Sequence, residues 1–311
     1  MSLGTIMHKN VKTALVIATL MITPQAFAAS PPAPPAQATD AAPARPVFAQ
    51  ASMNVFRRFA SEDRGKMIDF YQKVLALAPL QPINLGGGAQ MILFKVGSGQ
   101  IKLASGLKSD RKYHLGELNE ATGIRLYTLF FPDEAALSER FKANGYSVPK
   151  FKTIEDGRRA ALVKDPGGFN LELVIVPAAA EQAHPGVEVG INVSDLEKSR
   201  AFYRDFCGLE ELPPVKDAFL GVTKYPYRHG ETTIYLWSVS KKLPADTGSA
   251  GIQYVISNID AVDASAKAKG VTVETPLGGI PGFNMRTVWL NDPDGVTNYF
   301  YELGKPPDAV Q

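Results

Sequence analysis

Histidine and cysteine, the side chains most often used for proton transfer and nucleophilic attack near neutral pH, are scarce in this sequence. Beyond residue 28 the histidines are His114, His184 and His229, scattered along the chain in expected loops or at strand edges. His229 immediately precedes an expected strand that carries Tyr235 and Trp237. A surface histidine with its hydrogen bonds satisfied is the alternative for each of the three, and His229 is the one that remains a catalytic candidate.

Two further features have less chemical meaning. Cys207 is the only cysteine, so no intrachain disulfide can form, and a packed apolar role is expected. Gly86-Gly87-Gly88 is not followed by a helix that opens with Lys-Ser or Lys-Thr, which indicates a loop and not a phosphate cradle.

The composition is that of an ordinary globular protein, with a formal net charge of +2 and no block of like charges. Binding to nucleic acid or to an acidic membrane surface requires a concentrated basic face, so neither partner is expected. A small molecule is the expected partner, and the sequence does not indicate an oligomeric state.

The N-terminus has the pattern of an export signal. A basic start at residues 8–12 precedes an apolar run, Ala14–Ile22, and then the small-x-small sequence Ala26-Phe27-Ala28. The run is shorter than the roughly 20 residues that span a bilayer. We therefore expect residues 1–28 to be a signal peptide, residues 29–50 to be a Pro- and Ala-rich disordered leader, and the mature protein to be periplasmic or secreted.

From residue 51 one pattern of elements recurs four times: a strand, an amphipathic helix and three further strands. The first strands of the four units are expected at Val55–Ala60, Ile124–Phe131, Val187–Val193 and Ile252–Ile256. Two halves follow, residues 51–178 and 183–304, with a tail at 305–311. Because a single unit leaves one sheet face uncovered, we expect the two units of each half to pair around a pocket.

Two internal echoes support the repeat. Asp165-Pro166-Gly167-Gly168 and Asp292-Pro293-Asp294-Gly295 each precede the last strand of a half. Phe70-Tyr71 and Phe202-Tyr203 occupy equivalent places in two expected helices.

These residues resemble the vicinal oxygen chelate superfamily, which includes glyoxalases, bleomycin-resistance proteins and extradiol dioxygenases. Asn192-Val193-Ser194-Asp195 with Phe202-Tyr203 resembles the opening of a module, and the segment from Asp165 to Leu173 resembles its closing. The resemblance covers nearly all of residues 53–304. It implies an α+β fold of four βαβββ modules paired into two domains, whereas this fold supports many activities.

The resemblance also implies four metal-ligand positions in each half. They fall on Phe56 (or Val55), Lys102, Leu126 and Glu172, and on Glu188, Tyr235, Gly251 and Tyr299. Only Glu172 and Glu188 are ordinary ligands, and one ligand in each pocket does not hold a divalent ion. No metal and no other cofactor is therefore expected.

The departures from the ligand pattern suggest other chemistry. In the first half, Lys102 and Glu172 would converge, with the ammonium where a metal would be; the alternative is a structural ion pair. In the second half the resemblance places four side chains in one cavity: Glu188, Tyr235, Gln253 and Tyr299. Glu188 could act as a general base, or the aromatic side chains could simply fill the core. Glu188, His229 and Tyr299 are thus the catalytic candidates, and the ligand-binding candidates are Tyr235, Trp237, Gln253, Lys102 and Glu172.

Glu302 resembles the closing glutamate of the family, but strand alternation puts it on the face opposite Tyr299 unless a bulge intervenes. A divalent metal becomes possible only if this register is wrong.

Two functions of different kinds remain. One is an exported glyoxalase-like lyase or isomerase for a small oxygenated or aromatic molecule; the other is a sequestering protein of the bleomycin-resistance type. An extradiol dioxygenase is disfavoured, because its histidine positions match Gly251 and Glu188.

Overall fold

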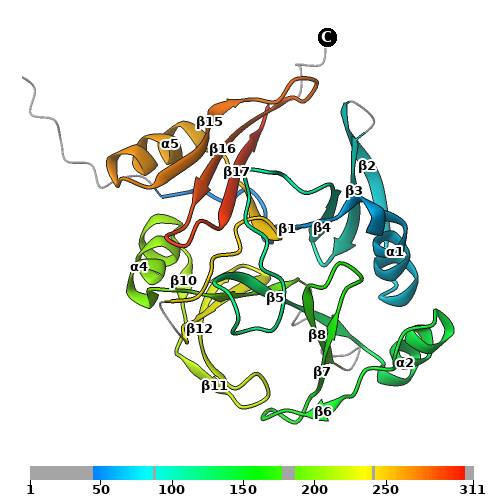
Figure 1. The fold of residues 1–311 in the computed structure, drawn as a ribbon. Coiled ribbons are helices and arrows are strands. Elements are labelled where there is room, and N and C mark those ends of the chain that lie inside the picture. Colours follow the sequence, from blue (N-terminus) through cyan, green and yellow to red (C-terminus); the bar gives the residue numbers. More distant parts are fainter. Residues whose placement is uncertain (1–44, 87–88, 177–185, 240–241, 305–311) are drawn as a thin grey trace, which may run out of the picture. The chain divides into compact units, whose positions relative to one another are not determined.

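Four βαβββ modules make up the chain, as the sequence predicts (Figure 1). The computed structural model describes residues 45–86, 89–176, 186–239 and 242–304, which belong to one compact unit. The first module contains β1 (Asn54–Phe59), α1 (Arg64–Asp69), a π-helical turn (Phe70–Val74), β2 (Pro79–Gly86), β3 (Ala89–Val96) and β4 (Gly99–Ser105). The second contains β5 (Gly123–Phe131), α2 (Glu134–Ala143), β6 (Lys152–Thr153), β7 (Arg159–Lys164) and β8 (Asn170–Ile175).

The second half of the chain repeats this order. The third module contains β9 (Glu188–Asn192), α4 (Leu196–Arg200), a π-helical turn (Ala201–Phe206), β10 (Glu210–Glu211), β11 (Val215–Asp217), β12 (Val222–His229) and β13 (Thr232–Trp237). The fourth contains β14 (Ala250–Val255), α5 (Ile259–Ala268), β15 (Thr272–Gly279), β16 (Met285–Asn291) and β17 (Thr297–Leu303). In every module the first and last strands pair in parallel: β1 with β4, β5 with β8, β9 with β13, and β14 with β17.

The modules combine into two sheets in an order that the sequence did not reveal. Sheet I has the strand order β15-β16-β17-β14-β1-β4-β3-β2, and sheet II has the order β10-β12-β13-β9-β5-β8-β7-β6, with β11 beside β12. Sheet I therefore joins the first and fourth modules through the antiparallel pair β1–β14, and sheet II joins the second and third through β5–β9. The expectation that each half of the chain closes its own pocket is wrong.

The internal echoes have a structural reason. The hydroxyl of Tyr71 donates to the carboxylate of Asp165 at 3.2 Å, and that of Tyr203 donates to Asp292 at 3.0 Å. Each tyrosine lies in a π-helical turn and each aspartate opens an Asp-Pro turn, so the two motifs of a half bind each other. These bonds link modules that do not share a sheet.

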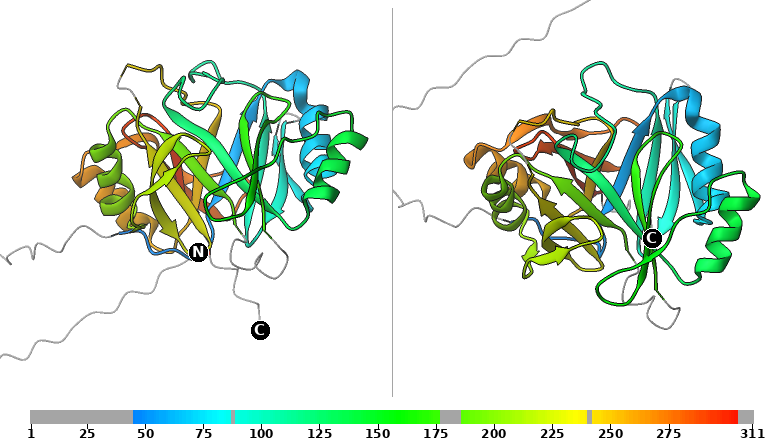
Figure 2. Two further views of the ribbon diagram at one scale, coloured as in Figure 1. Left: turned by 90° about the horizontal axis from the view of Figure 1, so that it is seen from below. Right: turned by 60° about the horizontal axis from the view of Figure 1, so that its bottom comes forward.

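The helices cover the outside of the sheets in two pairs (Figure 2). Phe70, after α1, packs edge-on against Phe141 of α2, and Lys269, after α5, donates to the carbonyl of Asp205 after α4. Asp133 is the N-cap of α2, as predicted, because its carboxylate accepts the backbone N–H of Ala136.

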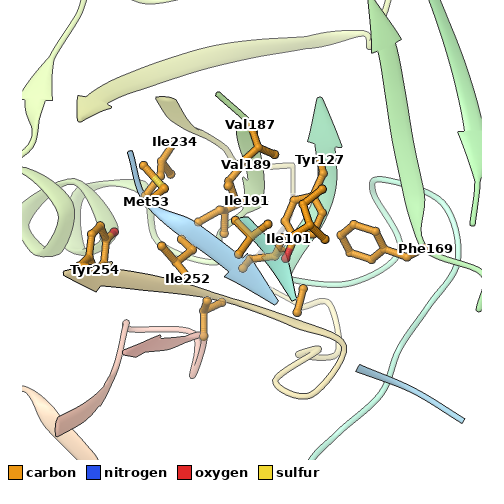
Figure 3. Close-up of a cluster of buried hydrophobic side chains, with 14 of the residues drawn as sticks. Met53, Ile101, Tyr127, Phe169, Val187, Val189, Ile191, Ile234, Ile252 and Tyr254 are labelled. Carbon is orange, nitrogen blue, oxygen red and sulfur yellow. The ribbon is translucent and has the colours of Figure 1, made fainter. Parts of the chain in front are cut away.

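The apolar core lies on the faces of sheets I and II that point toward each other. Figure 3 shows side chains of both sheets in one cluster, among them Ile101 and Ile252 of sheet I and Val189 and Ile191 of sheet II. With these faces buried, alternation along each strand directs the remaining side chains to the opposite, inner face of each curved sheet.

The N-terminal leader ends earlier than expected. Phe48 forms a bridge with Ile256, the N–H of Ala49 donates to the carbonyl of Val255, and the N–H of Ser257 donates to that of Val47. Residues 45–50 therefore belong to the fold, and the prediction of a disordered leader up to residue 50 is wrong for them. The expected signal peptide, the rest of the leader and the tail at 305–311 lie outside the described residues. Among the described helices none is long and apolar enough to cross a membrane.

Candidate functional site

The inner face of sheet II holds a pocket of about 260 Å³. Strands β5, β8, β9 and β13 form its floor, and its walls come from β11, β12 and the loop between β6 and β7. The N–H of Ala218, after β11, donates to the carboxylate of Glu155 at 2.6 Å. This bond joins the two edges of sheet II across the pocket.

Two glutamates flank a threonine on the pocket floor. Thr128 of β5 is in register with Glu172 of β8 on one side and with Glu188 of β9 on the other. Since neighbouring strands lie about 4.8 Å apart, the backbones of the two glutamates are roughly 10 Å apart. The sequence assigned this position of β5 to Leu126. Thr128, two residues further along the strand, lies there instead, and Leu126 is part of a core cluster.

A chain of hydrogen bonds fixes the floor. The Thr128 hydroxyl donates to Glu172 at 2.7 Å and lies 3.1 Å from the Tyr235 hydroxyl. Because threonine has a single hydroxyl proton, Tyr235 must donate to Thr128. Gly190 permits this position of the ring, since a Cβ there would lie 2.8 Å from Cε2 of Tyr235.

Lys224 of β12 places an ammonium at the centre of the pocket. Its Nζ lies 2.7 Å from the carboxylate of Asp217, 3.9 Å from that of Glu172 and 4.1 Å from the centre of the Tyr235 ring. Burial alone would lower the pKa of Lys224, but Tyr235 and the surrounding carboxylates raise it above its usual value. Lys224 is therefore a fixed positive charge at any moderate pH.

Glu188 is the carboxyl group of the site whose protonation is poised near neutrality. Burial raises its pKa to about 7, while Lys224 lowers it and Glu172 raises it. Its side chain remains partly accessible from the pocket, and among the described residues no hydrogen bond holds its carboxylate. The pKa of Glu172 is also raised by burial, although Lys224 and Thr128 oppose that shift. A carboxyl group with a pKa near 7 can exchange a proton with a bound molecule at physiological pH.

The side chains of this site do not fit a divalent metal ion. No cluster of three or more His, Cys, Asp or Glu residues in the described part of the chain has the arrangement to hold one. The ammonium of Lys224 lies beside Glu172, where it would repel a second cation. The family resemblance assigned this placement to Lys102; the side chain that provides it is Lys224.

Three residues that the sequence grouped with the pocket belong to sheet I. Lys102 donates to the side-chain oxygen of Gln253 at 2.6 Å, and Tyr299 packs edge-on against Phe56. The prediction that Lys102 lies close to Glu172 is therefore wrong. The prediction that Gln253 and Tyr299 share a cavity with Glu188 is also wrong. Burial lowers the pKa of Lys102 to about 8, consistent with an amide as its hydrogen-bond partner.

His229 and Trp237 also lie outside the pocket. His229 is at odd spacing from Lys224 along β12 and so points to the other face, where its ring is 4.0 Å from that of Phe48. Burial lowers the pKa of His229. Trp237 is buried beyond Tyr235, and its ring N–H donates to Asn119. Neither of these two side chains lines the pocket.

The position of Glu302 agrees with strand alternation. Its carboxylate accepts the N–H of Ile259 at the start of α5, whereas Tyr299 packs on Trp289 at the inner face. The predicted placement of Glu302 on the face opposite Tyr299 is confirmed.

Sequence reasoning found Glu188, Glu172 and Tyr235 but missed Lys224, Asp217 and Thr128. The segment from Val222 to His229 alternates as a strand does and would have directed Lys224 to the same face as Pro226. The proline and the surrounding charges concealed this signal, because proline argues against a strand assignment.

Comparison with known proteins points to one family. The family model described as Glyoxalase/Bleomycin resistance protein/Dioxygenase superfamily matches residues 57–173 and 186–300. Lactoylglutathione lyase GLX1 of Arabidopsis thaliana is 23% identical over 75% of this chain and 85% of its own length. Glyoxalase 1 of Caenorhabditis elegans is 23% identical over 76% of this chain and 83% of its own length.

Solved structures share the fold at low sequence identity. Glyoxalase I from Zea mays superposes with a TM-score of 0.61 at 19% identity, covering 81% of this chain and 92% of its own. A putative dioxygenase from Bacillus subtilis superposes with a TM-score of 0.55 at 15% identity, covering 85% and 87% of the two chains.

Proposed function

Because this chain belongs to the Glyoxalase/Bleomycin resistance protein/Dioxygenase superfamily, we propose that it is a lyase- or isomerase-type enzyme with its site in the sheet II pocket. The proposal rests on one pair of side chains, Glu188 and Lys224. Glu188 has a pKa of about 7 and no hydrogen bond among the described residues, and the fixed ammonium of Lys224 shares its pocket. A base and a positive charge at one site are what proton transfer next to a carbonyl group requires.

The residues divide the work as follows. Glu188 removes the proton from the carbon next to a carbonyl group, and the electron pair of that C–H bond moves onto the carbonyl oxygen. The positive charge of Lys224 stabilises the resulting enolate oxygen. If the carbon that lost the proton carries a hydroxyl group, the proton of that hydroxyl moves to the enolate oxygen and Glu188 returns its proton to the former carbonyl carbon, so that the carbonyl group shifts by one carbon. If a leaving group is bound to the β carbon, the enolate instead restores its carbonyl group, forms a C=C bond and expels that group with its bonding electron pair. The chain from Tyr235 through Thr128 to Glu172 holds the floor in place during both steps.

The charge of the pocket favours a neutral or cationic substrate. Five carboxyl groups line it, against three basic side chains, and Arg158 is already paired with Asp156. An acidic substrate would therefore be repelled. A glutathione conjugate, the substrate class in the name of the Arabidopsis relative, carries carboxylates and fits this pocket less well.

Deuterium exchange tests this proposal without knowledge of the physiological substrate. The protein is incubated in D2O with hydroxyacetone (neutral), glucosamine (cationic), hydroxypyruvate (anionic) or the hemithioacetal of methylglyoxal and glutathione. Proton NMR then follows loss of the signal next to the carbonyl group. We expect faster exchange with a neutral or cationic compound than with either anionic one. Saturable binding of these compounds without exchange would contradict an enzymatic function and favour the alternative, a sequestering protein.

We also propose that the chain is exported, on the evidence of the N-terminal pattern alone. Expression of the full chain in a bacterium and N-terminal sequencing of the periplasmic product should give a mature start at Ala29. Ala28→Tyr should block that cleavage. A product that stays in the cytoplasm with its N-terminus intact would refute the proposal.

A further inference from the structure

The inner face of sheet I contains a second pocket, lined by the basic side chains of Lys108 and Arg111 and by the carboxylates of Asp110 and Glu274. It has a volume of about 320 Å³ and continues into a small recess beside Phe56 and Tyr299. Lys108 and Arg111 line both the pocket and the recess, and Arg58 of β1 lines the recess. The pocket contains no residue of the proposed site in sheet II.

Three basic side chains gather at this recess. Burial and the charges of Arg58 and Arg111 lower the pKa of Lys108, while the carboxylate of Asp110 raises it, so these four charged groups lie near one another. Arg58 donates to the carbonyl of Gly106, and neither Arg58 nor Lys108 forms an ion pair with a described carboxylate. Arg111 is held in place by an ion pair with Glu274 and by a hydrogen bond to Thr297.

Aromatic rings form the other part of the wall. The rings of Trp289 and Tyr299 meet edge to face with centroids 4.4 Å apart, and the ammonium of Lys108 lies 5.4 Å from the centre of the Trp289 ring. The Tyr299 side chain is half-buried, and its hydroxyl makes no hydrogen bond with a described residue. Arg58 and Arg111 lie near enough to oppose the upward shift of its pKa.

The recess therefore offers guanidinium, ammonium and phenol donors, and the adjoining larger pocket offers the indole ring of Trp289. Two unpaired cations and a free hydroxyl match the oxygens of a carboxylate, and the indole matches a planar apolar group. We infer that the sheet I pocket binds a small planar organic carboxylate, with the carboxylate at Arg58 and Lys108 and the ring against Trp289.

Calorimetric titration of the full chain with benzoate tests this inference, with benzamide as a neutral molecule of the same shape. We expect saturable binding of benzoate with a dissociation constant of about 1 mM or lower, and no measurable binding of benzamide. Arg58→Gln and Lys108→Gln should each weaken benzoate about tenfold. Lys112→Gln is the matched control: Lys112 is exposed and lies outside both cavities, so this variant should change the affinity less than twofold.

Trp289→Leu should also weaken benzoate, which separates ring stacking from simple attraction of an anion. Glu188→Gln should leave benzoate binding unchanged, so this test is independent of the proposed reaction in sheet II. The inference is overturned if benzoate fails to saturate, if benzamide binds equally, or if Lys112→Gln weakens binding as much as Lys108→Gln. Circular dichroism of each variant establishes that it is folded before titration.

Discussion

The ammonium of Lys224 lies 3.9 Å from the carboxylate of Glu172, above the ring of Tyr235. This relationship determines the character of the sheet II pocket. Lys224 stays protonated and positively charged near neutral pH. Glu188 is then the carboxyl group of the pocket that gains and loses a proton in this range.

Removal of that ammonium should destabilise the protein. In Lys224→Met the carboxylates of Glu172 and Asp217 lose the cation that compensates their burial. We expect the free energy of unfolding to fall by about 3 kcal/mol in urea titrations at pH 7. Lys95→Met, at an exposed position of β3 outside the pocket, is the control and should change it by less than about 0.5 kcal/mol. Equal stability of the two variants would mean that Lys224 does not neutralise the pocket.

The exchange reaction should depend on pH through Glu188. Because a general base works only when it is deprotonated, the rate should rise through about pH 7, the pKa of Glu188, and level off above it. Rate measurements between pH 5.5 and pH 8.5 would show this rise, at roughly tenfold per pH unit below the pKa. A rate that falls with increasing pH over this range would assign Glu188 to the role of an acid.

The buried carboxyl group of Asp292 should make the free energy of unfolding depend on pH. Burial raises the pKa of Asp292 to about 7, so the folded state binds its proton more tightly than the unfolded state does. The stability from this group is complete below about pH 4 and is lost as the pH rises to about 7, by at most about 4 kcal/mol. Asp292→Asn should reduce this loss when unfolding free energies at pH 5 and pH 8 are compared. Asp69→Asn on exposed α1 should keep the wild-type difference between these two pH values.

Gly251 should tolerate no side chain. A Cβ at this position of β14 would lie 2.0 Å from Cε1 of Phe56, so the ring would have to leave the inner face of sheet I. Gly251→Ala should cost about 1–3 kcal/mol in thermal or urea unfolding. Gly65→Ala in α1 meets nothing within 4 Å and should stabilise by about 0.5–1 kcal/mol. If Gly251→Ala is neutral, the ring of Phe56 is not fixed against β14.

The sequence predicts the modules well but not their partners. The apolar spacing, the N-cap at Asp133 and the Asp-Pro turns are local signals, and they place strands and helices correctly. Which modules share a sheet depends on contacts between strands far apart in the chain, such as β1 with β14. Strand alternation gives the face of a residue but not its neighbour across the sheet.

The candidate site, too, combines features that local sequence signals predict with contacts between distant strands that they do not predict. Glu188 was identified correctly as a pocket residue, yet two of its neighbours on the floor, Glu172 and Thr128, come from the other half of the chain. Tyr299 and Gln253 were grouped with Glu188 because they share its half of the sequence, and they lie in sheet I. The register of β5 against β9, which sets Thr128 opposite Glu188, depends on a bulge between Ile124 and Leu126 that no residue type indicates.

In the proposed reaction, Glu188 transfers the proton in the sheet II pocket. The most direct test of this role compares the deuterium exchange rates of the wild type, Glu188→Gln and Glu197→Gln, with the compound that exchanges fastest. Glu197 is an exposed glutamate of α4, so its substitution should leave the rate unchanged. The account predicts that Glu188→Gln lowers the rate by at least about 10²-fold while the compound still binds. A rate within twofold of the wild type in Glu188→Gln would contradict it.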